Sequence, residues 1–438
     1  MATKLIENKW KKSVSRRDFL KGSAAACAVA ATPPMLLGCS KTVNYPSNDC
    51  LAESGSVSTP AGIKVFETAF FGPIKVKNRL VRSATTLGAT DEFGRPTQKL
   101  LDAYSELGQG GVGTIITGMG DSGLLLDDET FRDEDMDVHR KVPQVIHQYG
   151  AAAIQQISHK GSQIKGSRDE SLYSLNRLSD LEIEQLIQQF VKNIDKSRQV
   201  GFDGAQLHGA HGYLLSEFLS PAQNRRTDKW GGSTVNRFRI IGEIIKRSKE
   251  KHIDFPIFIK INGYDFQENG MRESEAVKIA KLLEKAGCDG IEVSCGVGRD
   301  GFSTVRMPMP PSAALKELTP LRQKPAMRKH ILSIVARYRM TSYTPLYNYN
   351  VCAASEIKKN ISIPVMVVGG IRSFQDMQTI VGKNLADFVS MGRPFIIEPG
   401  IANSLKDKNQ TESACINCGF CLLSASISEV KCYYGEVS

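Results

Sequence analysis

Short apolar segments alternate with amphipathic helical patterns from residue 63 to about residue 400, and this alternation constrains the fold more than any other feature. It is typical of βα units and a parallel sheet. Eight segments have the length and the β-branched content of barrel strands. They are Leu80-Ser83, Gly113-Thr117, Ala153-Ile157, Gly204-His208, Ile257-Ile261, Gly290-Ser294, Pro364-Val368 and Asp387-Met391.

The clearest helix is predicted to begin after Ser179. Its hydroxyl and the Glu182 carboxylate form a capping box, and apolar residues recur on one face from Ile183 to Ile194. Eight such βα units suit either a closed barrel or an open doubly wound sheet. Because no phosphate-binding GxGxxG or GxxxxGK stretch follows a strand, we predict the α/β class and a (β/α)8 TIM barrel. We assign it to residues 63–408, followed by a cysteine-rich extension at 409–438.

The charge of the chain excludes one class of partner. The formal net charge is +10, but seven Lys or Arg and two acidic residues lie in the first 39 positions. The rest carries 49 basic and 44 acidic residues, spread along the chain, so we expect no nucleic-acid binding. The longest irregular connection is predicted at residues 296–350, where basic residues form either a solvated face or contacts to an acidic substrate.

The N-terminus resembles an export signal sequence. Ser15-Arg16-Arg17-Asp18-Phe19-Leu20-Lys21 matches the motif of twin-arginine signals, which the twin-arginine translocon reads and which carry folded cargo. Leu36-Leu37-Gly38-Cys39 resembles a lipobox, although Leu37 is bulky for its position. We assign residues 1–39 to the signal and 40–62 to a polar tether. We expect an extracytoplasmic protein, in the periplasm or at the cell surface. The signal is cleaved, retained, or acylated at Cys39 to anchor the chain to the membrane surface.

The ten cysteines do not imply a disulfide framework. Isolated ones such as Cys288 and Cys352 are expected to be small buried apolar residues. Four at the C-terminus have the close spacing of a metal centre: Cys415, Cys418, Cys421 and Cys432. Their spacing leaves an iron–sulfur cluster, a closed zinc site and bare thiols as alternatives.

Two imidazoles and a phenol, His208, His211 and Tyr213, follow the fourth predicted strand. Barrel enzymes place their catalytic groups at this end of the strands. Two histidines three residues apart could also bind a metal, but no further ligand stands at the right spacing and the glycines predict a turn. A catalytic role is therefore favoured over a metal site or a buried structural histidine.

The same stretch resembles the central signature of the old yellow enzyme family of flavoproteins. The signature here comprises His208-Gly209-Ala210-His211-Gly212-Tyr213-Leu214, Phe218-Leu219-Ser220-Pro221 and Trp230-Gly231-Gly232-Ser233. Further similar motifs are spread over residues 63–400. They are Lys77-Asn78-Arg79-Leu80, Gly110-Gly111-Val112-Gly113, Gln156-Ile157-Ser158-His159, Val368-Gly369-Gly370-Ile371-Arg372 and Met391-Gly392-Arg393-Pro394.

This resemblance implies FMN at the C-terminal face of the barrel. It places Thr86 near the redox-active edge of the flavin, and Gln156 and Lys260 on its pyrimidine side. A cation at Lys260 would stabilise the negative charge that gathers there on reduction. The phosphate is expected to meet backbone N–H groups and a guanidinium, although ordinary turns would also explain the glycines. The residues are Gly369, Gly370, Gly392 and Arg393.

The implied reaction is hydride transfer to the β-carbon of an α,β-unsaturated carbonyl compound. His208 and His211 would bind the carbonyl oxygen, and Tyr213 would protonate the α-carbon. One alternative is an amine dehydrogenase that passes electrons outward, because amine cations are held by aromatic cages. Tyrosines for such a cage stand at 343, 347 and 349. Another is a surface flavoprotein that only binds or transfers electrons, which leaves the His–His–Tyr group unexplained.

The C-terminal cysteines resemble those of the iron–sulfur branch of this family, which includes dienoyl-CoA reductases and trimethylamine dehydrogenases. The usual run has one more residue before its third cysteine. The resemblance implies a 4Fe–4S cluster that exchanges electrons with the barrel flavin. Because an exported protein meets little NAD(P)H, we expect the donor to be a redox protein or a quinol-linked partner outside the cytoplasm.

Overall fold

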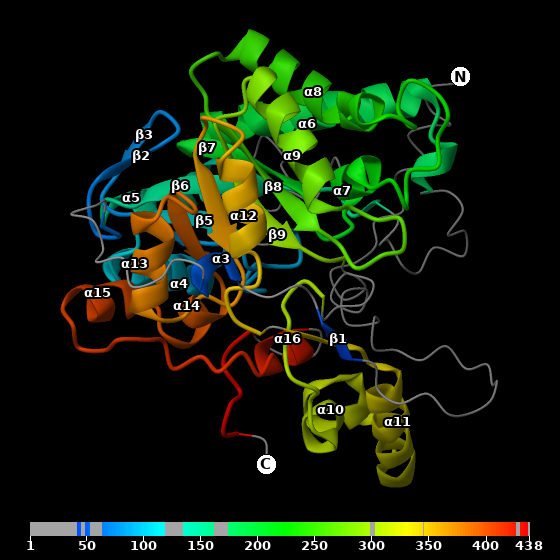
Figure 1. Ribbon diagram of the computed structural model, residues 1–438. Coiled ribbons are helices and arrows are strands. Elements are labelled where there is room, and N and C mark those ends of the chain that lie inside the picture. The colour runs from blue at the N-terminus through cyan, green and yellow to red at the C-terminus, as the bar shows by residue number, and fades with distance from the viewer. Residues whose placement is uncertain are drawn as a thin grey trace.

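The computed structural model describes residues 42–44, 49–52, 64–118, 135–161, 174–297, 303–344, 346–425 and 430–436. Its centre is a closed barrel of eight parallel strands, with the neighbour order β11-β12-β4-β5-β6-β7-β8-β9 (Figure 1). The strands are β4 Leu80–Arg82, β5 Thr114–Thr117, β6 Ala152–Ile157, β7 Gly204–Gly209, β8 Ile257–Tyr264, β9 Gly290–Cys295, β11 Val365–Val368 and β12 Phe388–Met391. The eight predicted strands and the TIM-barrel fold are therefore confirmed.

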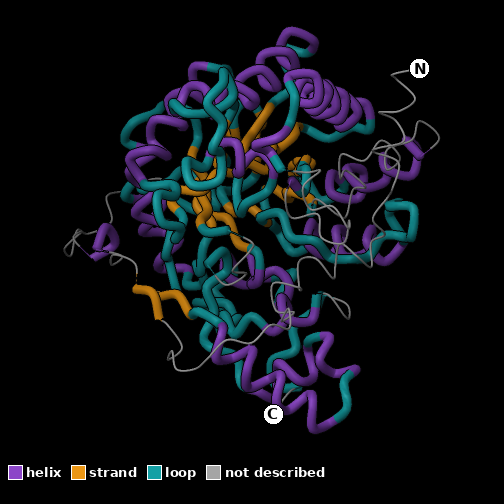
Figure 2. The backbone as a smooth tube through the Cα atoms, turned by 90° about the vertical axis from the view of Figure 1, so that its right-hand side faces the viewer, coloured by secondary structure: helices purple, strands orange, loops and turns teal. Residues whose placement is uncertain are grey.

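Helices surround the strands, as Figure 2 shows. The described helices along the barrel are α4 Gln98–Gln109, α5 Met136–His147, η4 Leu175–Arg177, α6 Asp180–Gln199, α7 Leu214–Leu219, α8 Thr234–Lys251, α9 Glu273–Lys285, α12 Val351–Lys358, α13 Phe374–Gly382, α14 Arg393–Ile397 and α15 Ile401–Lys406. Helix α6 begins as predicted, because the Ser179 hydroxyl accepts from the Glu182 backbone N–H and the Glu182 carboxylate accepts from the Ser179 backbone. Ile183, Leu186 and Phe190 on its buried face join the main hydrophobic core.

An antiparallel hairpin, β2 Ala69–Phe71 and β3 Ile74–Val76, precedes the barrel. Its Phe71 ring lies 4.3 Å from the ring of Phe258 and 5.0 Å from that of Phe388, both on barrel strands. These rings form a buried apolar cluster inside the barrel. The N-terminal end of the barrel is thus filled with side chains, and the opposite end carries the polar groups.

The connection at residues 296–350, expected to be irregular, contains regular structure. It includes α10 Ser312–Leu318, η5 Pro320–Gln323, α11 Ala326–Arg339 and β10 Ser342–Thr344. Leu315, Met340 and Tyr343 form a separate core with Phe420, which belongs to the C-terminal helix α16 Phe420–Ser424. We call residues 303–344 together with α16 the peripheral subdomain. Its helices depend on a partner segment about 100 residues away, which local periodicity does not reveal.

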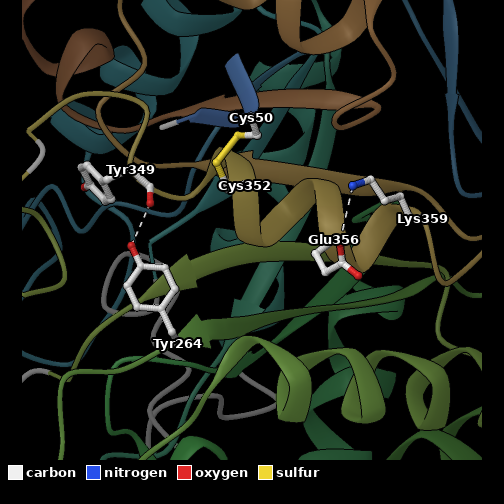
Figure 3. Close-up of a disulfide and its surroundings, with 6 residues drawn as sticks. All are labelled: Cys50, Tyr264, Tyr349, Cys352, Glu356 and Lys359. Carbon is white, nitrogen blue, oxygen red and sulfur yellow. Dashed lines mark hydrogen bonds and ion pairs between the residues drawn. A yellow bond between two sulfur atoms is a disulfide. The ribbon is translucent and has the colours of Figure 1, made fainter. Parts of the chain in front are cut away.

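The range expected to be a polar tether includes two elements that contact the body of the protein. Strand β1 Thr42–Asn44 pairs in parallel with β10, and helix α3 Asp49–Ala52 contacts α12. Cys50 forms a disulfide with Cys352, with the Cα atoms 5.5 Å apart (Figure 3). The expectation that Cys352 is a small buried apolar residue is therefore wrong. The partners are 302 residues apart, so no local spacing indicated the pair.

Cys288, by contrast, is a buried free thiol as expected. Its Sγ donates to the backbone carbonyl of Ile257 over 3.3 Å, and burial raises its pKa to about 12. The signal motif and Cys39 lie outside the described residues. No helix in the described part of the chain is long and apolar enough to span a membrane.

Candidate active site

Alternating residues of the barrel strands point inward and fill the interior in layers. Next to the apolar cluster around Phe71 lie five buried polar side chains from different strands. We call them the polar layer: Ser83, Gln156, Gln206, Lys260 and Glu292. Ladder register places Lys260 opposite both His208 and Glu292. The predicted flavin residues Gln156 and Lys260 both belong to this polar layer.

The polar layer is a connected hydrogen-bond network. Lys260 Nζ donates to Ser83 Oγ over 2.9 Å and lies 3.3 Å from Glu292 Oε2. Ser83 Oγ donates to Glu292 Oε1 over 2.7 Å. Gln206 donates to the other oxygen of Glu292 over 2.8 Å and accepts from Gln156 Nε2 over 2.8 Å. The buried lysine charge is therefore paired, and its ammonium group is held in one place.

The three residues predicted to be catalytic lie together at the C-terminal end of β7. The ring centroids of His208 and Tyr213 are 4.5 Å apart, and those of His208 and His211 are 5.1 Å apart with nearly perpendicular planes. His208 belongs to β7, whereas Tyr213 is the N-cap residue of α7. The turn between strand and helix therefore brings two imidazoles and a phenol to one position.

His211 is held in an uncommon backbone conformation. Its φ of 63° lies in the left-handed region, which few residues other than glycine adopt. The backbone N–H of His211 donates to Asn262 Oδ1 over 3.2 Å, and its ring Nε2 lies 2.7 Å from Ser294 Oγ. Asn262 and Ser294 come from β8 and β9, so two neighbouring strands orient this imidazole.

Burial sets the protonation states of the group. Burial, followed by the charges of His211 and Lys260, holds the pKa of His208 well below its usual range. Burial and then Lys260 lower the pKa of His211 to about 3, and burial raises the pKa of Tyr213. At neutral pH both imidazoles are neutral and the phenol is protonated. Among the described residues the buried Nδ1 of His208 has no hydrogen-bond partner, as expected for an atom that meets a ligand.

The glycines predicted to meet the FMN phosphate follow β11 and β12. Gly369 and Gly370 have φ values of 149° and 71°, which strongly favour glycine. A Cβ atom on Gly369 would lie 2.7 Å from Asn350 Nδ2, and one on Gly392 would lie 3.2 Å from Thr85 Oγ1. The neighbouring Thr86 is partly exposed. The Gly369 and Gly370 backbones, which leave no room for a side chain, and the paired lysine fit the needs of a flavin mononucleotide.

Arg393 lies between the barrel and the C-terminal segment. Its Nη1 donates to the backbone carbonyls of Arg306, over 3.3 Å, and Asn417, over 3.2 Å. Burial raises the pKa values of the Cys415 and Cys421 thiols, and the charge of Arg393 partly offsets this rise. The sequence does not indicate this link, because Arg306 and Asn417 are distant from Arg393 along the chain.

The four C-terminal cysteines are free, partly buried thiols. Burial raises the pKa of Cys421 to about 11, and Arg393 opposes this while the other three cysteines add to it. Within the described ranges, no three His, Cys, Asp or Glu side chains converge on one metal-ion position. A mononuclear zinc site needs thiolates about 3.8 Å apart. A 4Fe–4S cluster spreads its ligands further, because each thiolate binds a different iron.

This fold and this site define the class of FMN barrels that carry out oxidation and reduction. The family model described as "NADH:flavin oxidoreductase / NADH oxidase family" matches residues 64–297 and 313–412. The chain therefore belongs to the NADH:flavin oxidoreductase / NADH oxidase family, the family of the old yellow enzymes. A second model, the twin-arginine translocation pathway signal sequence, matches residues 13–33 and confirms the predicted export signal.

Known proteins agree with this assignment. NADH oxidase from Thermoanaerobacter brockii is 32% identical over 380 residues, which are 81% of this chain and 52% of that protein. A solved structure of 2-naphthoyl-CoA reductase with 2-naphthoyl-CoA matches with a TM-score of 0.67 at 21% identity, covering 84% of this chain and 56% of that one. The old yellow enzyme homologue from Zymomonas mobilis matches with a TM-score of 0.60 at 20% identity, covering 81% and 96%. The chain thus spans about half the length of the first two proteins, and the two structures show the shared fold.

Sequence reasoning missed the residues that support the predicted ones. These are Ser83, Gln206, Asn262, Glu292 and Ser294. The signal that could have found them is a polar residue at an inward position of an otherwise apolar strand, as in Gly290-Ile-Glu-Val-Ser294. Such a residue cannot reach solvent and must have a partner inside the barrel.

Proposed function

We propose that this exported protein uses FMN to reduce the carbon–carbon double bond of an α,β-unsaturated carbonyl compound, with Tyr213 as the proton donor. The observation that carries the proposal is the group of His208, His211 and Tyr213 at the end of β7, with ring centroids 4.5 and 5.1 Å apart. Two hydrogen-bond donors and a proton donor at one position are what this reduction requires.

The two histidines bind the carbonyl oxygen of the substrate. Because their pKa values are lowered, both rings are neutral, and each carries one N–H that can donate. These donors stabilise the negative charge that develops on the oxygen. The contacts of His211 with Asn262 and Ser294 hold its ring ready before substrate arrives.

Tyr213 delivers the proton to the α-carbon. Burial raises the pKa of its phenol, so the proton stays on the oxygen throughout the neutral and moderately alkaline range. A tyrosine is a weak acid, and it can protonate this carbon only because the developing carbanion is a stronger base. Position therefore matters more than acidity.

FMN, when bound, supplies the hydride for the β-carbon. Thr86 would lie near its reactive edge, and Gln156 and Lys260 would meet its pyrimidine side, where the lysine charge offsets negative charge. The phosphate would be held by backbone N–H groups of glycines and, as predicted from the sequence, by a guanidinium. These residues are Gly369, Gly370, Gly392 and Arg393.

The tyrosines of the connection at residues 296–350 favour reduction over amine oxidation. Tyr347 faces the Arg372 guanidinium at 4.6 Å, and Tyr349 faces Arg306 at 4.6 Å. The Tyr343 ring is buried at 4.5 Å from Phe266. Rings that already contact arginine cations or pack in a core do not form an open cage for an amine cation.

Tyr213→Phe tests the reaction. Protein reduced anaerobically with dithionite is mixed with 2-cyclohexenone, and flavin reoxidation is followed by absorbance. We expect reoxidation at least about 100-fold slower than in the wild type, with unchanged FMN content. Tyr149→Phe, which alters an exposed tyrosine bonded to Ser105 over 3.2 Å, is the matched control and should react normally. Unchanged rates of the Tyr213 variant with every enone tested would refute the assignment.

We also propose that Cys415, Cys418, Cys421 and Cys432 hold a 4Fe–4S cluster. Support comes from the electrostatic proximity of the four thiols and from Arg393, which contacts both barrel and cysteine segment. The cluster would receive electrons from an extracytoplasmic redox protein or a quinol-linked partner. The cofactors would be loaded before export, because twin-arginine signals carry folded proteins. We further propose that Cys39 is acylated and tethers the chain to the membrane surface.

Metal analysis tests the cluster. Anaerobically purified protein should contain about four irons and an equal amount of acid-labile sulfide per FMN, and Cys421→Ala should lose both while keeping FMN. Cys288→Ala, which removes a buried thiol that bonds only backbone carbonyls, is the control. Zinc in place of iron, or no metal under anaerobic loading, would contradict the proposal.

A further inference from the structure

Helix α11 of the peripheral subdomain presents apolar side chains to the outside. Met327 is 79% exposed, Ile331 53% and Ile334 51%. Their spacing of four and three residues places them on one face of the helix. Among the described helices, no other carries more than one exposed large apolar side chain. A solvated helix normally shows the opposite pattern, so this face requires an explanation.

The opposite face of α11 attaches the helix to the protein. Ser333 and Ala336 are buried there, and Ala336 belongs to the core of the peripheral subdomain. Lys329 on the same side pairs with Glu317 of α10 over 2.9 Å. Small residues therefore pack the helix against the peripheral subdomain, and its larger apolar side chains point away from that core.

Basic residues surround the exposed apolar face. Residues 312–339 contain seven Lys or Arg and a single acidic residue, Glu317. Arg328 and Arg337 are exposed and flank the apolar face on opposite sides of the helix. An apolar stripe bordered by cations is the pattern of helices that lie in the interface of an anionic membrane.

The N-terminal segment of the chain reaches the protein beside this helix. Thr42 pairs with Ser342, three residues after the end of α11 at Arg339. The export signal occupies residues 13–33, so the membrane-directed part of the chain lies just upstream of this point. Figure 1 shows β1, α10 and α11 grouped at one edge of the molecule, outside the barrel.

We propose that α11 docks on the surface of an anionic phospholipid bilayer. Met327, Ile331 and Ile334 enter the interface between headgroups and acyl chains, and the flanking basic residues pair with lipid phosphates. This inference rests on export and not on the proposed reaction. Because α10 contacts α16, which carries Cys421, docking brings the cysteine segment close to the membrane surface.

Vesicle flotation tests this proposal. The chain from residue 40 onward keeps every described residue and lacks both the signal and Cys39. It is mixed with vesicles of equal parts phosphatidylcholine and phosphatidylglycerol, and the bound fraction is measured. Ile331→Gln combined with Ile334→Gln should bind at least about tenfold more weakly. Arg328→Gln and Arg337→Gln should each weaken binding about fivefold at low salt.

Ile253→Gln is the matched control, because it removes an isoleucine that is 71% exposed in the turn before β8. It should bind vesicles like the parent, and FMN content checks the folding of every variant. Absence of vesicle binding by the parent would overturn the proposal, and so would unchanged binding by the Ile331/Ile334 variant. A dimer in solution that the same variant dissociates would instead assign the face to a second copy of this chain.

Discussion

The two ends of the barrel interior are equally buried and chemically opposite. At the N-terminal end Phe71, Phe258 and Phe388 are all fully buried, and the Phe71 ring contacts the other two. Towards the other end Glu292 is also fully buried, and Lys260 is only 3% exposed. The apolar end gains free energy from burial itself, whereas the polar layer is tolerated only because each charge has a partner. Exposure therefore does not separate the structural end from the functional end, but the pairing of charges does.

The largest effect is expected from Glu292→Leu, which leaves the Lys260 charge buried without its partner. The free energy of unfolding, measured by urea denaturation, should fall by about 3–5 kcal/mol. Adding Lys260→Met should restore much of that stability but not FMN binding. Phe71→Ala is the comparison at the apolar end, where a loss of about 3 kcal/mol should leave FMN binding intact. Equal stability of the single and double variants would show that the two charges are not coupled.

A smaller effect is expected from each single unit of pH, and it should arise at the polar end. The pKa of His208 is well below its usual value and that of His211 is lowered to about 3, so the unfolded chain binds more protons than the folded protein below pH 6.5 or so. The stability that these residues contribute is therefore complete above about pH 6.5 and is lost as the pH falls towards 3, by about 1.4 kcal/mol per unit for each histidine.

Urea midpoints between pH 7 and pH 4 measure this dependence. His211→Gln should make the stability of the protein less sensitive to pH in this range. His147 is expected to behave in the opposite way, because its hydrogen bond to Asp203 raises its pKa. Its contribution to the free energy of unfolding should be lost as the pH rises. A pH dependence that His211→Gln leaves unchanged would show that other groups cause it.

The strands and the helix α6 could be predicted because their signals are local. β-branched runs of four to eight residues and the Ser179–Glu182 capping box lie within single elements. The helices and strand of residues 303–344 were missed because their apolar residues pack on α16 and because β10 pairs with β1. The contacts that stabilise these elements come from segments distant in sequence.

The candidate site also contains residues that a local motif predicts and residues that only the fold brings together. His208, His211 and Tyr213 stand within six residues, so one motif predicts all three. The pairing of the supporting residues could not be predicted, because Asn262 and Glu292 come from different strands, Ser83 directly follows a third, and the strands meet only when the barrel closes. The Cys50–Cys352 pair is the extreme case, because its two halves are 302 residues apart.

That disulfide also has a mechanical meaning. The β1–β10 pairing alone covers three residues on each strand, and tension on the N-terminal segment could peel it away. The covalent bond from Cys50 leads such tension to Cys352 in the first turn of α12. This helix follows directly after Tyr349, whose backbone N–H donates to the carbonyl of Gly369 over 3.2 Å. Tension on the N-terminal segment is thus transmitted to the wall of the barrel, beside the glycines expected to meet the FMN phosphate.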